Sequence, residues 1–534
     1  MTCPSLENLP TDILVLIFGQ FCLHCQDEYN QPWDVPPLRY RLARQKPDEK
    51  SWYSLDRQAL VSLSLTSKRF QQIAQSILYH GFVLGYDDSW RTALYTWDGR
   101  LISFMRTLRQ RRDLARLVRV VYVHPSLLEV IHGDRPRDVL GEAAETLGID
   151  LAEIWKSRIP RPESFDRTEI PKTRELFLAP LAYGFDYAAL GYFRDVHTRR
   201  RERDWVATEL VAMLIAQFPN LRYLAVQRSS RWTSESVTAS ALTALNISSL
   251  PFQRLDIGSN PVDVVRLSPG LEILNLYATG FWGQCPPLPN LKILRMTECW
   301  TMKKHLEDLL HACTTGLRTF AYESRPPTRA CNAGLRRNMH FQPSDAVRLL
   351  SFHQRTLESL HLDLSAQGRA VCKIEDGLHF KDFAVLEHLC VGSEMIYGFD
   401  GMQDKNFPHS EALIRLLPAS LVSLSIQTKQ MEETGQAMLE KGLVRLAEVK
   451  QRQPDQFPKL RWVQCELGSE IDWLSSMFEA VNVQFTSSSW SLTKAKPYLN
   501  GTDWTVDRII GFTYSDDFSE DELFAPTRQG EVER

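Results

Sequence analysis

Two cysteines and a histidine near the start of the chain stand at the spacing of half a metal site. Cys22-x-x-Cys25, with His24 between the cysteines, matches one half of a zinc site that would need a second pair of ligands. No second Cys-x-x-Cys and no suitably spaced histidine pair follows nearby, and Cys22 ends an apolar segment, where a buried thiol is ordinary. We therefore expect no metal ion here and no cofactor elsewhere in the chain.

A second group of residues able to bind a metal, Cys299, His305, His311 and Cys313, is close only in sequence. Cys313 continues the apolar stripe of an expected helix. His305 and His311 are six residues apart and so lie on different faces of that helix. This spacing favours a chance grouping over a second metal site.

The sequence contains none of the common local motifs of enzyme active sites that we considered. No Walker loop, Gly-x-Ser-x-Gly elbow, His-Glu-x-x-His or Gly-x-Gly-x-x-Gly is present. Two basic runs, Arg106–Arg116 and Arg199–Arg203, allow nucleic-acid binding or nuclear import as alternatives. Leucines interleave the first run, which is typical of the polar face of an amphipathic helix, and the second lies in an expected loop. We predict a protein that is not an enzyme and has no nucleic-acid partner.

Composition and charge point to an ordinary globular protein. The 534 residues include 62 Lys and Arg against 65 Asp and Glu, a net charge of −3, and 43% are hydrophobic. No apolar stretch approaches the roughly 18 residues of a membrane span, and Glu7, Asn8 and Asp12 interrupt any signal-peptide core. Scattered cysteines fit a reducing compartment. We expect an intracellular protein of the cytoplasm or nucleus, or both, with no membrane partner.

Three short helices are predicted at the N-terminus. Leu9, Ile13, Ile17 and Phe21 recur every four residues and predict one apolar helix within 6–21. Further helices are expected over 56–65 and 67–78, with Thr66 or Ser67 as the cap of the last. A unit this small buries little core, so we expect it to lean on a partner.

These segments resemble an F-box. The family's opening pattern of Leu-Pro, an acidic residue and aliphatics is matched by Leu9-Pro10-x-Asp12-Ile13-Leu14-x-x-Ile17-Phe18. Its later Leu-x-x-Val-Cys-Lys-x-Trp-like segment is matched more loosely, by the run from Leu63 to Phe70. The chain departs from the family by an insertion, about 24–55, whose prolines and charges predict a surface loop.

The resemblance implies docking onto the Skp-type adaptor of a cullin–RING ubiquitin ligase. Carried over residue by residue, the implied adaptor-binding residues are Leu9, Pro10, Ile13, Leu14, Ile17, Phe18, Leu63 and Phe70. The alternative is that these residues only form the core of an N-terminal helical cap.

A degenerate repeat fills most of the remaining chain. One pattern, an apolar residue at positions 1, 4 and 6, begins at Val118, Leu221, Phe252, Leu271, Leu291, Leu317, Leu357, Leu386, Leu421 and Leu460. This is the strand pattern of leucine-rich repeats, whose period is roughly 20–29 residues. Between the strands lie helical stripes such as Leu306, Leu309 and Leu310. Fungal F-box proteins with degenerate leucine-rich repeats resemble the whole arrangement.

The strands alternate in polarity, which predicts one face open to solvent on the concave side of a curved array. The outward positions mix both signs of charge, so we expect them to bind one protein target rather than a polyanion. The predicted target-binding residues are Asp256, Asn275, Tyr277, Arg295, Glu323, His361 and Asp363.

The fold predicted is α/β: a three-helix F-box followed by an irregular leucine-rich-repeat-like solenoid, with a curved parallel sheet and helices on its convex side. The expected domains are an F-box at 1–82, a linker with a first repeat-like region at 83–205, the repeat array at 206–510 and an acidic disordered tail at 511–534. The expected function is a substrate receptor of a Skp–cullin–F-box ligase that binds an unknown protein target. The alternative is a leucine-rich-repeat scaffold that recruits the adaptor outside any ligase.

Overall fold

The computed structural model describes most of the chain outside its longest connections. The described residues are 6–26, 52–85, 94–124, 135–150, 210–226, 247–258, 261–277, 284–299, 301–324, 341–364, 380–397, 409–428, 433–465 and 472–487, with single positions 127, 128, 242, 245 and 467. The basic run at 199–203 and the predicted acidic tail lie outside these residues.

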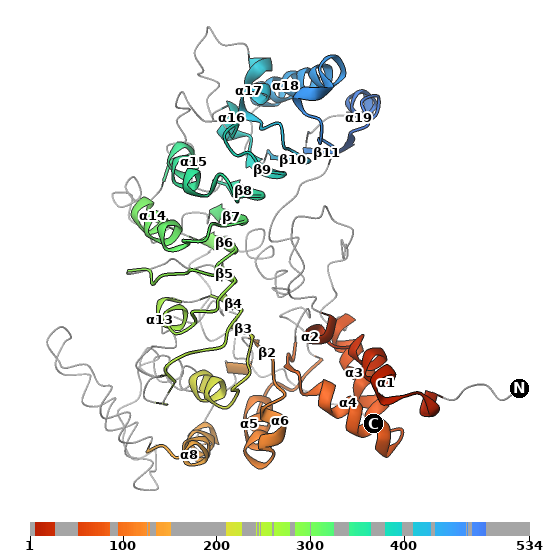
Figure 1. Ribbon diagram of the computed structural model, residues 1–534, viewed down its shortest axis with the longest axis vertical. Coiled ribbons are helices and arrows are strands. Elements are labelled where there is room, and N and C mark those ends of the chain that lie inside the picture. Colours follow the sequence, from red (N-terminus) through yellow and green to blue (C-terminus); the bar gives the residue numbers. More distant parts are fainter. Residues whose placement is uncertain are drawn as a thin grey trace, which may run out of the picture.

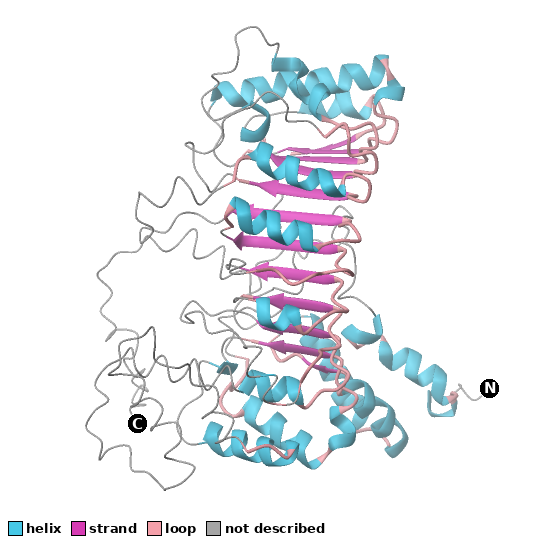
Figure 2. Ribbon diagram, turned by 60° about the vertical axis from the view of Figure 1, so that its left-hand side comes forward, coloured by secondary structure: helices cyan, strands magenta, loops and turns pink. Residues whose placement is uncertain are grey.

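Within the described residues, twelve parallel strands form one sheet, and they follow one another in chain order. The strands are β1 Gly81–Phe82, β2 Val120–Val123, β3 Tyr223–Val226, β4 Arg254–Ile257, β5 Ile273–Tyr277, β6 Ile293–Cys299, β7 Thr319–Ser324, β8 Ser359–Asp363, β9 His388–Gly392, β10 Ser423–Gln427, β11 Trp462–Cys465 and β12 Gln484–Thr486. Figure 2 shows them stacked as one column of parallel arrows. The sequential order confirms the predicted α/β architecture with a parallel sheet.

Each predicted strand pattern forms one of the strands β2 to β11. The two end strands, β1 and β12, were not predicted because they have only two and three residues. The predicted boundary at residue 82 therefore falls at the end of the first strand, and the expected linker region at 83–205 contains β2.

Helices connect the strands and cover one face of the sheet. They are α5 Arg100–Gln110, α6 Arg112–Ala115, α8 Arg135–Leu147, a helix at 210–216, α13 Val262–Arg266, α14 Lys303–Ala312, α15 Pro343–Leu350, α16 Glu394–Tyr397, α17 Ala412–Leu416, α18 Glu433–Arg452 and α19 Asp472–Glu479, with 3-10 turns η5 Ser351–His353, η7 His409–Glu411 and η8 Pro454–Gln456. Figure 1 shows α13, α14 and α15 on the same side of the strands. The basic run over 106–116 lies on α5 and α6, as expected of an amphipathic polar face.

The core lies between this face of the sheet and the helices. Leu255, Leu274 and Leu294 are adjacent in register on β4, β5 and β6, and none is exposed. On α14 the predicted stripe of Leu306, Leu309 and Leu310 is fully buried against the same core. Each unit thus buries its apolar face only against its neighbours, as in a quasi-one-dimensional array.

The N-terminal helical unit, residues 6–26 and 52–78, precedes the sheet. It consists of η1 Leu6–Asn8, α1 Thr11–Gly19, α2 Leu23–Gln26, α3 Trp52–Ser64 and α4 Lys68–Leu78. Its helices lie beside the first strands (Figure 1). The predicted loop at 24–55 is wrong at both ends, because α2 occupies its first residues and α3 begins four residues before the predicted Asp56. Ser67 caps α4 as predicted, since its side chain accepts a 3.2 Å hydrogen bond from the Phe70 amide.

Polar contacts join the N-terminal helical unit to β1 and to the segment before α5. The Arg57 guanidinium on α3 donates a 2.6 Å hydrogen bond to the carbonyl oxygen of Gly81 in β1. The hydroxyls of Ser54 and Tyr95 lie 2.6 Å apart. Among the helices described, none has the length and apolar character needed to span a bilayer.

Candidate interaction surfaces

Helix α1 is apolar all around and therefore has two different apolar faces. Leu14 and Phe18 point inward and have no exposed surface. Ile13, Leu16 and Ile17 point outward and are 42%, 65% and 36% exposed. The outward three share one face because positions i, i+3 and i+4 align on a helix. An exposed apolar stripe of this kind is typical of a surface that binds another molecule.

The inward face of α1 closes a small core within the N-terminal helical unit. The rings of Phe18 and Phe70 meet edge to face, with centroids 5.3 Å apart at 88°. The cluster is completed by Leu14, Cys22, Leu60, Ile73, Ala74 and Ile77. The unit therefore has its own packing, and the outward residues of α1 are not needed for it.

The segment before α1 is held by one arginine from α4. Arg69 donates a 2.6 Å hydrogen bond to the carbonyl oxygen of Leu9 and bonds to the carbonyl of Glu7. A longer bond of 3.4 Å reaches the hydroxyl of Thr11. One guanidinium thus binds three acceptors, on both sides of Pro10, and ties the start of α1 to α4.

The predicted adaptor-binding residues divide between surface and core. Pro10, Ile13 and Ile17 are exposed, whereas Leu9 and Leu63 are half-buried. Leu14, Phe18 and Phe70 are buried among the helices, so their side chains are not at the surface in this structure. The four-residue recurrence that suggested one stripe did not separate the two faces. Sequence reasoning missed other exposed apolar residues of the unit, namely Leu6, Val15, Leu16, Leu55, Val61 and Leu65.

On the sheet, the face opposite the core carries a buried polar cluster. The guanidinium of Arg254 and the carboxylate of Asp256 are paired at 3.1 Å with 2% and 1% of their side chains exposed. Asp256 also accepts a 2.7 Å hydrogen bond from the Tyr223 hydroxyl and one from the Asn275 amide. Arg254 lies over the Tyr223 ring, 4.6 Å from its centroid. Every donor therefore converges on one carboxylate.

The prediction that this face is open to solvent is wrong over its central strands. Asp256, Asn275, Arg295, Glu323, His361 and Asp363 are all buried, with no more than 5% of any residue exposed. Alternation identifies which face a side chain occupies but not whether water reaches it. Strands about 4.8 Å apart bring long polar side chains of neighbouring strands together. His361 and Glu323, diagonal neighbours on β8 and β7, lie 3.4 Å apart in this way. The side chain of Tyr277 lies outside the described residues.

The same face becomes accessible at the last strands. On β10 and β11, Ser423, Ser425 and Gln464 are half-buried, and Trp462 is 38% exposed. The core-facing residues between them, such as Leu424 and Val463, remain fully buried. His388 on β9 is half-buried and its Nδ1 lies 2.8 Å from the Ser423 hydroxyl. The accessible part of the polar face is thus centred on a tryptophan.

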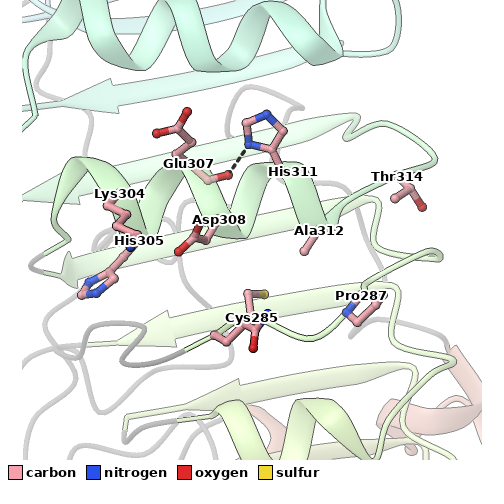
Figure 3. A pocket seen from close by; sticks show the side chains of 10 residues that line it. Cys285, Pro287, Lys304, His305, Glu307, Asp308, His311, Ala312 and Thr314 are labelled. Carbon is pink, nitrogen blue, oxygen red and sulfur yellow. Dashed lines mark hydrogen bonds between the residues drawn. The ribbon is translucent and has the colours of Figure 1, made fainter.

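One open hollow of about 870 Å³ lies along α14 and contains several titratable side chains (Figure 3). Glu307 and His311 point to one side of the helix and Asp308 to the other, and His311 Nδ1 lies 2.8 Å from the Glu307 carbonyl oxygen. Burial, and to a lesser degree Asp308, raises the pKa of Cys285 to about 12, so this thiol is a poor nucleophile. These groups do not converge on one reacting position.

Among the described residues, a single group of three side chains could hold a metal ion. Cys22, Cys25 and His80 place their two sulfurs and one ring nitrogen within 4.8 Å of one another. His80 was not considered from sequence because it lies 55 residues after Cys25. Cys299, His305, His311 and Cys313, all among the described residues, do not form such a group.

No protein-family model matches the chain, and no curated protein matches its sequence.

Proposed function

We propose that this chain is the substrate-recognition subunit of a Skp–cullin–F-box ubiquitin ligase. In this proposal the N-terminal helical unit is an F-box that binds the Skp-type adaptor, and the sheet with its helices is a leucine-rich-repeat-like solenoid that binds a target protein. The observation that carries the proposal is the exposed apolar stripe of Ile13, Leu16 and Ile17 beside an exposed Pro10. A contiguous apolar stripe on a unit whose own core is already closed is typical of a protein interface.

The polar contacts between the N-terminal helical unit and the residues that follow it support the same proposal. A ligase receptor acts by proximity, holding the lysines of its target near a ubiquitin-charged enzyme, and a fixed geometry raises their effective concentration. The Arg57 bond to the Gly81 carbonyl joins the unit to β1, and the Ser54–Tyr95 contact joins it to the segment before α5. The chain itself would perform no chemistry.

We place the target-binding surface at the C-terminal end of the sheet. The central polar residues predicted for this role are buried, whereas Trp462 and its half-buried neighbours Ser425 and Gln464 are accessible. An exposed tryptophan ringed by small polar groups has the composition of an interface hot spot. Target binding is therefore placed at one end of the concave face, in place of the whole face predicted from sequence.

The adaptor test uses substitutions on the outward face of α1. Ile13→Asp with Ile17→Asp would put two charges into the apolar contact, and we expect adaptor binding in pull-down and calorimetry to fall at least about a hundredfold, since a buried unpaired charge costs several kcal/mol. The control is Phe352→Asp, an equally apolar residue that is 62% exposed on η5.

Circular dichroism should be the same for both variants and the unaltered chain. Adaptor binding that survives the double substitution would contradict the proposal. If adaptor binds but cullin does not co-purify and no captured protein is ubiquitinated in a reconstituted reaction, the chain is a scaffold and not a ligase receptor.

A further inference from the structure

Three side chains with metal-binding atoms meet at the joint between the N-terminal helical unit and the sheet. Cys22 follows α1, Cys25 belongs to α2, and His80 lies between α4 and β1. His80 Nδ1 lies 3.8 Å from the Cys22 sulfur and 3.3 Å from the Cys25 sulfur. Two sequence-distant segments thus supply one cluster.

These distances fit a tetrahedral ion. With Zn–S bonds of about 2.3 Å and Zn–N bonds of about 2.0 Å, sulfur and nitrogen ligands stand about 3.5 Å apart across a tetrahedral angle. The two observed sulfur–nitrogen distances lie on either side of that value. These two sulfur–nitrogen pairs would therefore need to move only a few tenths of an ångström, and all three ligand atoms lie within 4.8 Å of one another.

Local packing brings the second sulfur into place. A Cβ added to Gly19 would lie 3.3 Å from the Cβ of Cys25, so the glycine allows α2 to fold closely back on α1. Cys22 is only 4% exposed and belongs to the core of the N-terminal helical unit. One side of the cluster is therefore dry and the other, at Cys25, is open to an entering ion.

We propose that Cys22, Cys25 and His80 bind one structural Zn²⁺ ion. His24 is the nearest candidate for the fourth position, since its Nδ1 lies 4.0 Å from the Cys25 sulfur and its ring centroid 5.0 Å from that of His80. Two thiolates with one or two imidazoles form a ligand set that selects zinc over the harder cations.

The ion would fasten the N-terminal helical unit to the sheet. The carbonyl oxygen of His80 accepts hydrogen bonds from the amides of Arg119 and Val120, at 2.8 and 3.0 Å, where the first two strands begin to pair. Coordination of His80 by Cys22 and Cys25 would hold α1 and α2 against that point and close a long loop in the chain. This inference does not depend on the adaptor, because it concerns the joint alone.

The test measures metal in the full-length chain, purified under reducing conditions. We expect one equivalent of bound zinc by mass spectrometry, and replacement by Co²⁺ should give the visible bands of a tetrahedral site with thiolate charge transfer. Cys25→Ser and His80→Ala should each lose most of the zinc. Cys285→Ser, a partly buried thiol outside the cluster, should keep it.

Alkylation of the unaltered chain gives a readout that does not depend on the folding of a variant. Cys22 and Cys25 should be protected from iodoacetamide until a chelator is added, and then become reactive. Less than a stoichiometric amount of zinc in the unaltered chain, or equal zinc in Cys25→Ser, would overturn the proposal. A Cys22–Cys25 disulfide in metal-free protein under the same reducing conditions would overturn it in favour of a redox pair.

Discussion

The guanidinium of Arg69 donates a 2.6 Å hydrogen bond to the carbonyl oxygen of Leu9, sixty residues earlier in the chain. The bond joins the start of α1 to α4, across the insertion that separates the two halves of the N-terminal helical unit. The edge-to-face contact of Phe18 with Phe70 joins the same two helices from inside. Polar and apolar contacts together therefore fix how Pro10 and the outward face of α1 are presented.

If α1 binds the proposed adaptor, replacing this arginine should weaken that binding without altering the contact itself. Arg69→Met keeps the length of the side chain but removes the donors to Leu9 and Glu7, and hydrogen bonds from a charged group contribute about 1.5–3 kcal/mol. We expect a loss of about tenfold or more in calorimetry and faster amide exchange at the start of α1. Lys68→Met, at the exposed neighbouring position, should change neither quantity.

The buried pair of Arg254 and Asp256 predicts an asymmetric response to substitution. Asp256→Ala removes the partner of a buried guanidinium and should cost about 3–5 kcal/mol of unfolding free energy, measured in urea. The double change Arg254→Met with Asp256→Leu should recover most of that loss, because neither charge of this pair is then left buried without its partner. A double variant as unstable as Asp256→Ala alone would mean that the cluster stabilises the sheet beyond its charges.

The control for this pair is an exposed pair just before strands β5 and β6. Lys292 and Glu272 are 2.7 Å apart, with half or nearly half of each side chain exposed. Glu272→Ala should cost no more than about 1 kcal/mol, since solvent screens such pairs. A similar cost at both sites would contradict the role assigned to burial.

The strands could be predicted from sequence because each repeats one local pattern, and period-two alternation directly identifies the core-facing residues. The accessibility of the opposite face could not be predicted from sequence. Asp256, for example, accepts hydrogen bonds from Tyr223 and Asn275, which lie on other strands. For the same reason the apolar residues of α1 could be found but not divided between core and surface. That division depends on where α4 packs.

The metal-binding cluster shows a similar limit. The sequence offers Cys22 and Cys25 as a local pair, but the third ligand enters only through the fold. Nothing in the spacing singles out His80, which follows α4. The turn that carries it is placed by the packing of Ile77 in the core of the N-terminal helical unit and by hydrogen bonds to Arg119 and Val120.

His124 predicts that the chain becomes less stable in mild acid. Its ring stacks on Trp97, with centroids 4.3 Å apart, and burial lowers its pKa to about 3. The unfolded chain, with an ordinary histidine pKa of about 6.5, then binds a proton that the folded chain does not. Stability should therefore fall as the pH decreases below about 6.5, by up to about 1.4 kcal/mol per pH unit from this residue, until about pH 3.

His124→Phe retains a stacking ring but removes the titration. Urea unfolding at about pH 7.5 and about pH 5 should show a smaller loss of stability in this variant than in the unaltered chain. The comparison at the higher pH serves as the internal control, because His124 is neutral in both states there. An unchanged difference between the two pH values would show that other groups cause the acid sensitivity.

Substitutions on the two faces of α1 should affect different properties, stability on the inward face and binding on the outward face. Phe18 has no exposed surface and packs on Phe70, so Phe18→Ala should cost about 3–5 kcal/mol and loosen the whole N-terminal helical unit. Leu16 is 65% exposed, so Leu16→Ala should change stability by no more than about 0.5 kcal/mol. If the outward face binds the adaptor, Leu16→Ala should nevertheless weaken that binding about tenfold, measured by calorimetry on the folded variant. Full-strength binding by Leu16→Ala together with Ile17→Ala would mean that the outward stripe is covered by something other than the adaptor.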